Sequence, residues 1–134
     1  MTLVLDASVL IELLVMSPLG QRAAARIRTA TDLHVPHLAD IEILSVARGL
    51  VAGSALPSER AERLLDDLRD FPAARWPAHM LFERIWALRD NATAYDATYV
   101  ALTEALGGTL LTADRKLARG VRGIATCEIE LVTR

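Results

Sequence analysis

The stretch Leu3-Val4-Leu5-Asp6-Ala7-Ser8 shows how this chain is built, because a short apolar run is followed at once by an acidic residue and a helix. The run is typical of a buried strand, and residues 8–15 predict a helix. The same order returns at Thr109-Leu110-Leu111-Thr112-Ala113-Asp114, after which we expect a short helix over residues 114–119. Short apolar strands that alternate with helices indicate an α/β fold with a parallel sheet covered on both faces.

The rest of the chain continues this alternation. Further strands are predicted at residues 33–35, 74–76 and 127–132, and a turn at residues 17–20 is expected to lead into the second helix. Other helices are predicted over residues 37–51, from residues 57–59 onward, and over 79–88 and 93–106. The helix at 37–51 has apolar residues on nearly every side, so we expect it to be deeply packed.

Composition limits the class of protein. The 134 residues fit one domain (residues 1–134), and a net charge of -2 argues against a simple polycation that binds nucleic acid by bulk charge. The single cysteine, Cys127, excludes an intrachain disulfide and a cysteine-based zinc site. No signal peptide is evident, and the longest apolar stretch, interrupted by Glu12, is too short to span a bilayer. We therefore expect a cytoplasmic protein with no membrane partner.

Four acidic residues are candidates for a shared site. Asp6 and Asp114 each follow a strand, and the carboxyl ends of parallel strands gather functional groups. Asp96 lies at a helix start, and Glu42 lies in the middle of a helix with no cation three or four positions away. Glu42 is expected in a buried apolar arc with Leu38, Ser45, Val46 and Gly49.

Each acid also has a simpler interpretation. Asp6 and Asp114 are residues that often cap helices, and Thr93 with Asp96 is similar to a capping box. Glu42 would then be compensated by an ion pair with a distant arginine.

Convergence of the four carboxylates would favour a bound cation. Two like charges ~5 Å apart at an effective dielectric constant of about 20 repel by roughly 3 kcal/mol, so the cluster must take up protons or a metal. Oxygen ligands without histidine or cysteine suit Mg²⁺ or Mn²⁺ and disfavour zinc. Such a metal activates water and screens a phosphate. Ser8, Asn91 and Thr112 lie close to the acids in sequence and are the candidate supporting residues.

These motifs resemble those of PIN-domain ribonucleases, and specifically the VapC toxins of toxin–antitoxin pairs. The similarity covers essentially the whole chain. The motifs that carry it are Leu5-Asp6-Ala7-Ser8, Glu42 on a helix after a proline, Tyr95-Asp96-Ala97-Thr98-Tyr99-Val100-Ala101-Leu102 and Leu110-Leu111-Thr112-Ala113-Asp114, the last followed by Arg115-Lys116-Leu117-Ala118.

The resemblance implies a three-layer α/β/α fold with a short central parallel sheet. It implies a Mg²⁺- or Mn²⁺-dependent endoribonuclease that cleaves structured RNA such as tRNA or rRNA loops, forms a homodimer and is inhibited by a VapB-type antitoxin. The family's catalytic and metal-binding acids correspond to Asp6, Glu42, Asp96 and Asp114. Some relatives carry a further acid or asparagine where this chain has Arg115 and Lys116, so the resemblance leaves open whether the site binds one metal or two.

Basic residues follow the last acid. Arg115, Lys116 and Arg119 are candidate contacts for RNA phosphates, and Arg122 joins the same face if the helix continues past Gly120. The alternative is a solvated helix end that carries cations favoured by the helix dipole. A second pair, Arg22 and Arg26, would line the opposite wall.

Two other functions stay open at this point. A DNA- or flap-cutting nuclease of related fold would use a similar acid cluster, and a regulatory module would bind Mg²⁺ without catalysis. Tyr95 and Tyr99 are expected in the core or a dimer interface.

Overall fold

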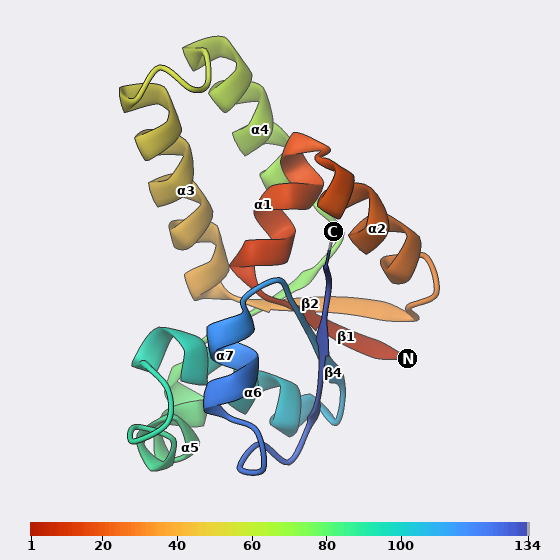
Figure 1. Cartoon of the computed structure of the whole chain (residues 1–134), viewed down its shortest axis with the longest axis vertical. Coiled ribbons are helices and arrows are strands. Elements are labelled where there is room, and N and C mark those ends of the chain that lie inside the picture. The colour runs from red at the N-terminus through yellow and green to blue at the C-terminus, as the bar shows by residue number, and fades with distance from the viewer. Residues whose placement is uncertain (134) are drawn as a thin grey trace.

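Residues 1–133 are described by a computed structural model, in which five strands form one parallel sheet with helices on both faces (Figure 1). The strand order is β3-β2-β1-β4-β5, and every neighbouring pair is parallel. All five strands predicted from the sequence are present, with the bounds β1 (Thr2–Leu5), β2 (Asp32–Pro36), β3 (Ala74–Trp76), β4 (Thr109–Thr112) and β5 (Glu128–Leu131).

Figure 1 shows the first four helices on one side of the sheet and α5 and α6 on the other. The predicted three-layer arrangement is therefore confirmed. No helix within residues 1–133 has both the length and the apolar character needed to cross a membrane. The helices are α1 (Ala7–Val15), α2 (Pro18–Ile27), α3 (His37–Ala52), α4 (Ser58–Asp70), α5 (Phe82–Ala87) preceded by a 3₁₀ turn (His79–Leu81), α6 (Ala94–Leu106) and α7 (Arg115–Gly120).

The strand order creates a switch point at the centre of the sheet. The chain runs outward from β1 through β2 to β3, then returns to place β4 on the other side of β1. The backbone N–H of Asp6 donates to the carbonyl of Leu111 at 3.0 Å, which continues the pairing of β1 with β4 past the end of β1. Functional groups of open α/β sheets gather beyond the strand ends at such a point.

The prediction that α3 is deeply packed is wrong. Ala39, Ile43 and Ala47 are buried, but Ile41 is 63% exposed and Leu44 is 43% exposed. The reason is visible in Figure 1, where α3 and α4 run side by side as a hairpin that projects away from the sheet. Only one face of α3 can meet the core in this position, so its remaining apolar residues face outward.

The turn predicted at residues 17–20 is replaced by the start of α2. The Ser17 hydroxyl accepts a hydrogen bond from the backbone N–H of Gly20, and Pro18 occupies the first helical position, where it needs no donor. Gly20 lies directly against α1, because a Cβ added there would stand 2.0 Å from the carbonyl oxygen of Glu12. Glycine is thus required for the close approach of α1 and α2.

Candidate active site

Asp6 is the most buried member of the candidate site. It is only 5% exposed and follows β1 directly. The hydroxyls of Ser8 and Thr112 both donate to its Oδ2 atom, at 2.6 and 2.8 Å. Burial raises the pKa of the Asp6 carboxyl, and the two hydroxyl donors oppose that rise because they favour the ionised form. Asp6 makes no side-chain cap for α1, so the capping interpretation of this residue is wrong.

The same two hydroxyls join the end of β4 to the start of α1. Ser8 Oγ accepts from the backbone N–H of Ala113 at 3.0 Å, and Thr112 Oγ1 accepts from that of Asp114 at 3.0 Å. Thr112 is fully buried, so this network fixes its geometry away from water. Asn91 is exposed in the turn before α6 and takes no part in this network.

Asp114 and Asp96 both lie at helix starts. Asp114 caps α7, since its Oδ1 atom accepts from the backbone N–H groups of Lys116 and Leu117 at 2.9 and 3.2 Å. Thr93 caps α6, because its hydroxyl accepts from the backbone N–H of Asp96 at 3.1 Å. The cap predicted for Asp114 is confirmed. The capping box predicted for Thr93 and Asp96 is formed only in its first half, because Thr93 caps the helix but the Asp96 carboxylate makes no bond to the backbone of Thr93. These caps leave the Asp96 carboxylate and the second oxygen of Asp114 outside the capping bonds.

Glu42 reaches the cluster from α3 and is held by Tyr99 of α6. The Tyr99 hydroxyl donates to Glu42 Oε1 at 2.5 Å. Burial raises the pKa of the Glu42 carboxyl, and the bond from Tyr99 works in the opposite direction. The alternative for Glu42, an ion pair with a distant arginine, is absent among residues 1–133.

The apolar arc expected around Glu42 is not buried either. Glu42 itself is half-buried, and Val46, one turn further along α3, is 41% exposed. Tyr99 is the polar contact that sequence reasoning missed, because it was assigned to the core or an interface. The available signal was its position three residues after Asp96, which places both on one face of α6.

The four carboxylates act on one another electrostatically. The pKa of Asp96 is raised to about 6, first by burial and then by the charges of Asp6, Asp114 and Glu42. No ion pair within residues 1–133 includes any of the four. The charges of Asp6, Asp114 and Glu42 thus all act on Asp96, although the four residues come from different parts of the chain: the end of β1, α3, α6 and the start of α7.

The donor set fits a hard divalent cation. It consists of carboxylate and hydroxyl oxygens, which Mg²⁺ and Mn²⁺ prefer, and its negative charge has no internal counterion. Within residues 1–133, no three acidic, histidine or cysteine side chains already stand in an arrangement that could hold an ion. The fit therefore depends on chemistry and charge, and ion binding requires side chains to draw together.

Cations border the acids on one side. Arg115, Lys116 and Arg119 are exposed on α7, directly after Asp114. The helix ends at Gly120, so the condition that would place Arg122 on the same face is not met. The second predicted pair is engaged elsewhere, with Arg26 bound to Glu130 at 2.7 Å and Arg22 donating to the carbonyl of Thr133.

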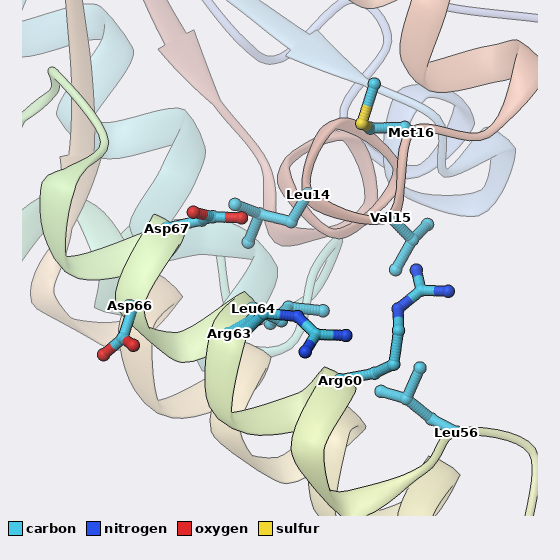
Figure 2. Close-up of a pocket in the computed structure, with 9 residues that line it drawn as sticks. All are labelled: Leu14, Val15, Met16, Leu56, Arg60, Arg63, Leu64, Asp66 and Asp67. Carbon is cyan, nitrogen blue, oxygen red and sulfur yellow. The ribbon is translucent and has the colours of Figure 1, made fainter.

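A separate groove lies between the end of α1 and α4 (Figure 2). It has a volume of about 340 Å³, and none of the four acids lines it. Figure 2 shows apolar side chains from both helices facing a rim that carries both signs of charge. The lining residues are Leu14, Val15, Met16, Leu56, Arg60, Arg63, Leu64, Asp66 and Asp67.

Comparison with known proteins agrees with the fold and the motifs. A family model described as PIN domain matches residues 3–122. The VapC ribonuclease Mb0985 of Mycobacterium bovis is 42% identical over 132 residues, which cover 98% of this chain and 99% of that protein. The chain belongs to the VapC family of PIN-domain proteins. Another VapC-family relative, ribonuclease VapC12 of Mycobacterium tuberculosis, is 35% identical over 130 residues, covering 97% of this chain and 98% of the relative.

Solved structures show the fold of the VapC family in more distant proteins. PAE2754 from Pyrobaculum aerophilum gives a TM-score of 0.72 at 22% identity, covering 96% of this chain and 82% of that one. VapBC-1 from nontypeable Haemophilus influenzae gives 0.71 at 17% identity over the full length of both chains. FitAB bound to an IR36 DNA fragment gives a TM-score of 0.71 at 14% identity, and the match covers 96% of this chain and 94% of that one. The fold expected from the resemblance is confirmed.

Proposed function

We propose that this VapC-family chain is a Mg²⁺- or Mn²⁺-dependent endoribonuclease, the toxin of a VapBC pair, which cleaves structured RNA such as tRNA or rRNA loops. The observation that carries the proposal is that the charges of Asp6, Glu42 and Asp114 all act on Asp96, while no ion pair within residues 1–133 includes any of the four. Relatives that match almost the whole chain are named ribonucleases.

Each group of residues at the site has its own role in the proposed RNA cleavage. Asp6, Glu42, Asp96 and Asp114 would hold the cation, which when bound supplies an acidified water and screens the phosphate. Ser8 and Thr112 favour the ionised form of the Asp6 carboxylate and orient it through their bonds to Oδ2. Tyr99 does the same for Glu42. Arg115, Lys116 and Arg119 draw the RNA backbone toward a cluster that would otherwise repel it.

Asp96→Asn tests this proposal with little change in shape. We expect RNA cleavage to fall by about 100-fold or more, because metal assistance is worth several kcal/mol. Asp90→Asn, at an exposed position in the turn before α6, is the matched control and should cut like the wild type. Full activity of Asp96→Asn would exclude the mechanism.

Matched RNA and DNA single strands separate the alternative functions in the same assay. Preferential cleavage of DNA would indicate the DNA or flap nuclease. Metal binding without cleavage of either strand would indicate the regulatory module.

We also propose that a VapB-type antitoxin binds and inhibits this chain. Several similar solved structures are VapBC or FitAB complexes, which supports such a partner. The groove of Figure 2 offers apolar contacts flanked by both signs of charge, as a protein partner requires. If a small reading frame lies next to this gene, co-expression with its product should yield a copurifying complex whose ribonuclease activity is suppressed. Purification of the two proteins apart would contradict the pairing.

The proposed homodimer is supported by apolar side chains that the single chain leaves exposed. Ile41 on α3, Phe82 and Trp86 on α5 and Tyr95 on α6 are each more than 60% exposed. Sedimentation of the purified chain should give a dimer, and Trp86→Asp should shift it toward monomer. A monomer at every concentration would exclude the dimer.

A further inference from the structure

A cavity of about 520 Å³ adjoins the carboxylate cluster. Its size falls in the range of roughly 300–1,000 Å³ that is usual for small-molecule sites. Its walls include Ser8, Ile11 and Glu12 of α1, Leu19 of α2, Arg115 of α7 and Val132 after β5. Ser8, Ile11 and Glu12 follow the spacing i, i+3, i+4, so their side chains share the face of α1 that borders the cavity.

The cavity shares residues with the candidate active site. Ser8, in its wall, donates to Asp6 Oδ2 at 2.6 Å. Arg115, which also lines the cavity, is the residue after Asp114. An RNA phosphate placed at the carboxylates would therefore bring a neighbouring nucleotide to the mouth of this cavity.

Two opposite charges in the lining are free to meet a ligand. Neither Glu12 nor Arg115 takes part in an ion pair or a side-chain hydrogen bond within residues 1–133. The Glu12 carboxylate accepts hydrogen bonds and repels phosphate, so the group that meets it must carry N–H or O–H donors. The apolar residues Ile11, Leu19 and Val132 suit the flat faces of a ring. These features match the base of a nucleotide, with Arg115 left for its phosphate.

We propose that this cavity binds a guanine base of the RNA beside the scissile phosphate, and that Glu12 selects it. Guanine is the base that presents two adjacent donor groups, N1–H and N2–H₂, to the two oxygens of one carboxylate. Adenine, cytosine and uracil each offer a single donor group on that edge. The proposal rests on the proposed function, since it takes RNA as the substrate, but it assigns a residue and a base that the family resemblance does not.

Binding of mononucleotides tests the subsite without any cleavage. In metal-free solution, guanosine 5′-monophosphate should shift the backbone amide signals of Glu12 and Arg115 in ¹⁵N NMR spectra. Inosine 5′-monophosphate, which lacks the N2 amino group, should bind about tenfold more weakly, since one hydrogen bond is worth roughly 1–1.5 kcal/mol. Glu12→Gln should remove this discrimination, whereas Glu62→Gln, exposed on α4, should retain it. Equal binding of adenosine and guanosine monophosphates would overturn the proposal.

Cleavage mapping then separates the subsite from the ribonuclease itself. In a random-sequence RNA pool, wild-type cuts should share a guanine at one fixed position, and Glu12→Gln should cut without that preference. RNA cleavage with no guanine preference would overturn the subsite and leave the ribonuclease standing. Guanine binding through Glu12 without any RNA cleavage would support the subsite and overturn the ribonuclease.

Discussion

Tyr99 shows how one side chain serves both the core and the candidate active site. The residue is only 1% exposed, and its hydroxyl donates to Glu42 Oε1. The bond favours the ionised form of Glu42 and so holds its pKa below the value that burial alone would give. A carboxylate that must bind a cation near neutral pH depends on such a donor.

Tyr99→Phe should therefore displace the pH dependence of RNA cleavage. The substitution keeps the ring and removes the donor, so the pKa of Glu42 rises further and the acid side of the profile moves to higher pH. Activity should approach the wild-type value once Glu42 is ionised. Tyr95→Phe, at an exposed position on the same helix, is the control and should leave the pH profile unchanged. An unshifted profile in Tyr99→Phe would show that Glu42 does not need this donor.

At the residue scale, sequence reasoning succeeded where local rules apply. Asp6 and Asp114 follow strands, and the spacing of two residues to Ser8 and Thr112 placed both hydroxyls near the acids. The partner of Glu42 could not be predicted in this way. The bond from Tyr99 joins residues 57 positions apart, and it depends on how α3 and α6 approach each other across the molecule.

At the element scale, the contact of α1 with α2 depends on a missing side chain. Gly20 of α2 lies against the carbonyl of Glu12 in α1, and both atoms of that contact belong to backbones that cannot rotate aside. The two helices approach each other closely only because residue 20 has no Cβ. Gly49 in α3 is the matched control, because no atom lies within 4 Å of the position that an added Cβ would take there.

The two glycines should respond to alanine in opposite directions. Gly20→Ala should lower the free energy of unfolding by about 1–3 kcal/mol or more, because the helices must separate. Gly49→Ala should raise it by roughly 0.5–1 kcal/mol, since alanine is the better residue inside an exposed helix. Urea unfolding of both variants measures the difference. Equal effects would show that the close approach at Gly20 is not required.

Element positions were predicted well from the sequence, but the environment of α3 was not. The apolar run of a strand, the capping residue of a helix and a glycine at a helix end are local signals. For this reason all five strands and the cap at Thr93 are where they were predicted. The apolar pattern of α3 does not distinguish burial in the core from exposure on a projecting hairpin. Ile41 and Leu44 satisfy the pattern equally well in either setting.

At the scale of the whole molecule, the clustered charges make stability depend on pH. The pKa of Asp96 is about 6 in the folded chain, whereas the ordinary value for an aspartate is 3.8, so the folded state binds more protons between these two pH values. Stability should therefore fall as the pH rises through this window and remain lower above it. Burial raises the pKa values of Asp6 and Glu42 in the same direction.

Thermal unfolding with and without metal tests this coupling. In a chelating buffer the wild type should melt at a higher temperature at about pH 5 than at about pH 7.5, and Asp96→Asn should show a smaller difference. At the higher pH, Mn²⁺ at 100 times its Kd should raise the free energy of unfolding of the wild type by roughly 2.7 kcal/mol. A melting temperature that Mn²⁺ leaves unchanged would show that the cluster does not hold the cation.

The order of strands in the sheet also bears on timing during synthesis. β1 is made first, yet its partner on one side is β4, which follows after α6. Asp6 obtains the Thr112 hydroxyl and the neighbouring Asp114 only when β4 has docked. In a nascent chain that has emerged only as far as α6, Asp6 lacks the Thr112 hydroxyl that holds it, and Asp114 has not yet been made. For the proposed ribonuclease, we expect activity only after β4 has been made and has joined the sheet beside β1.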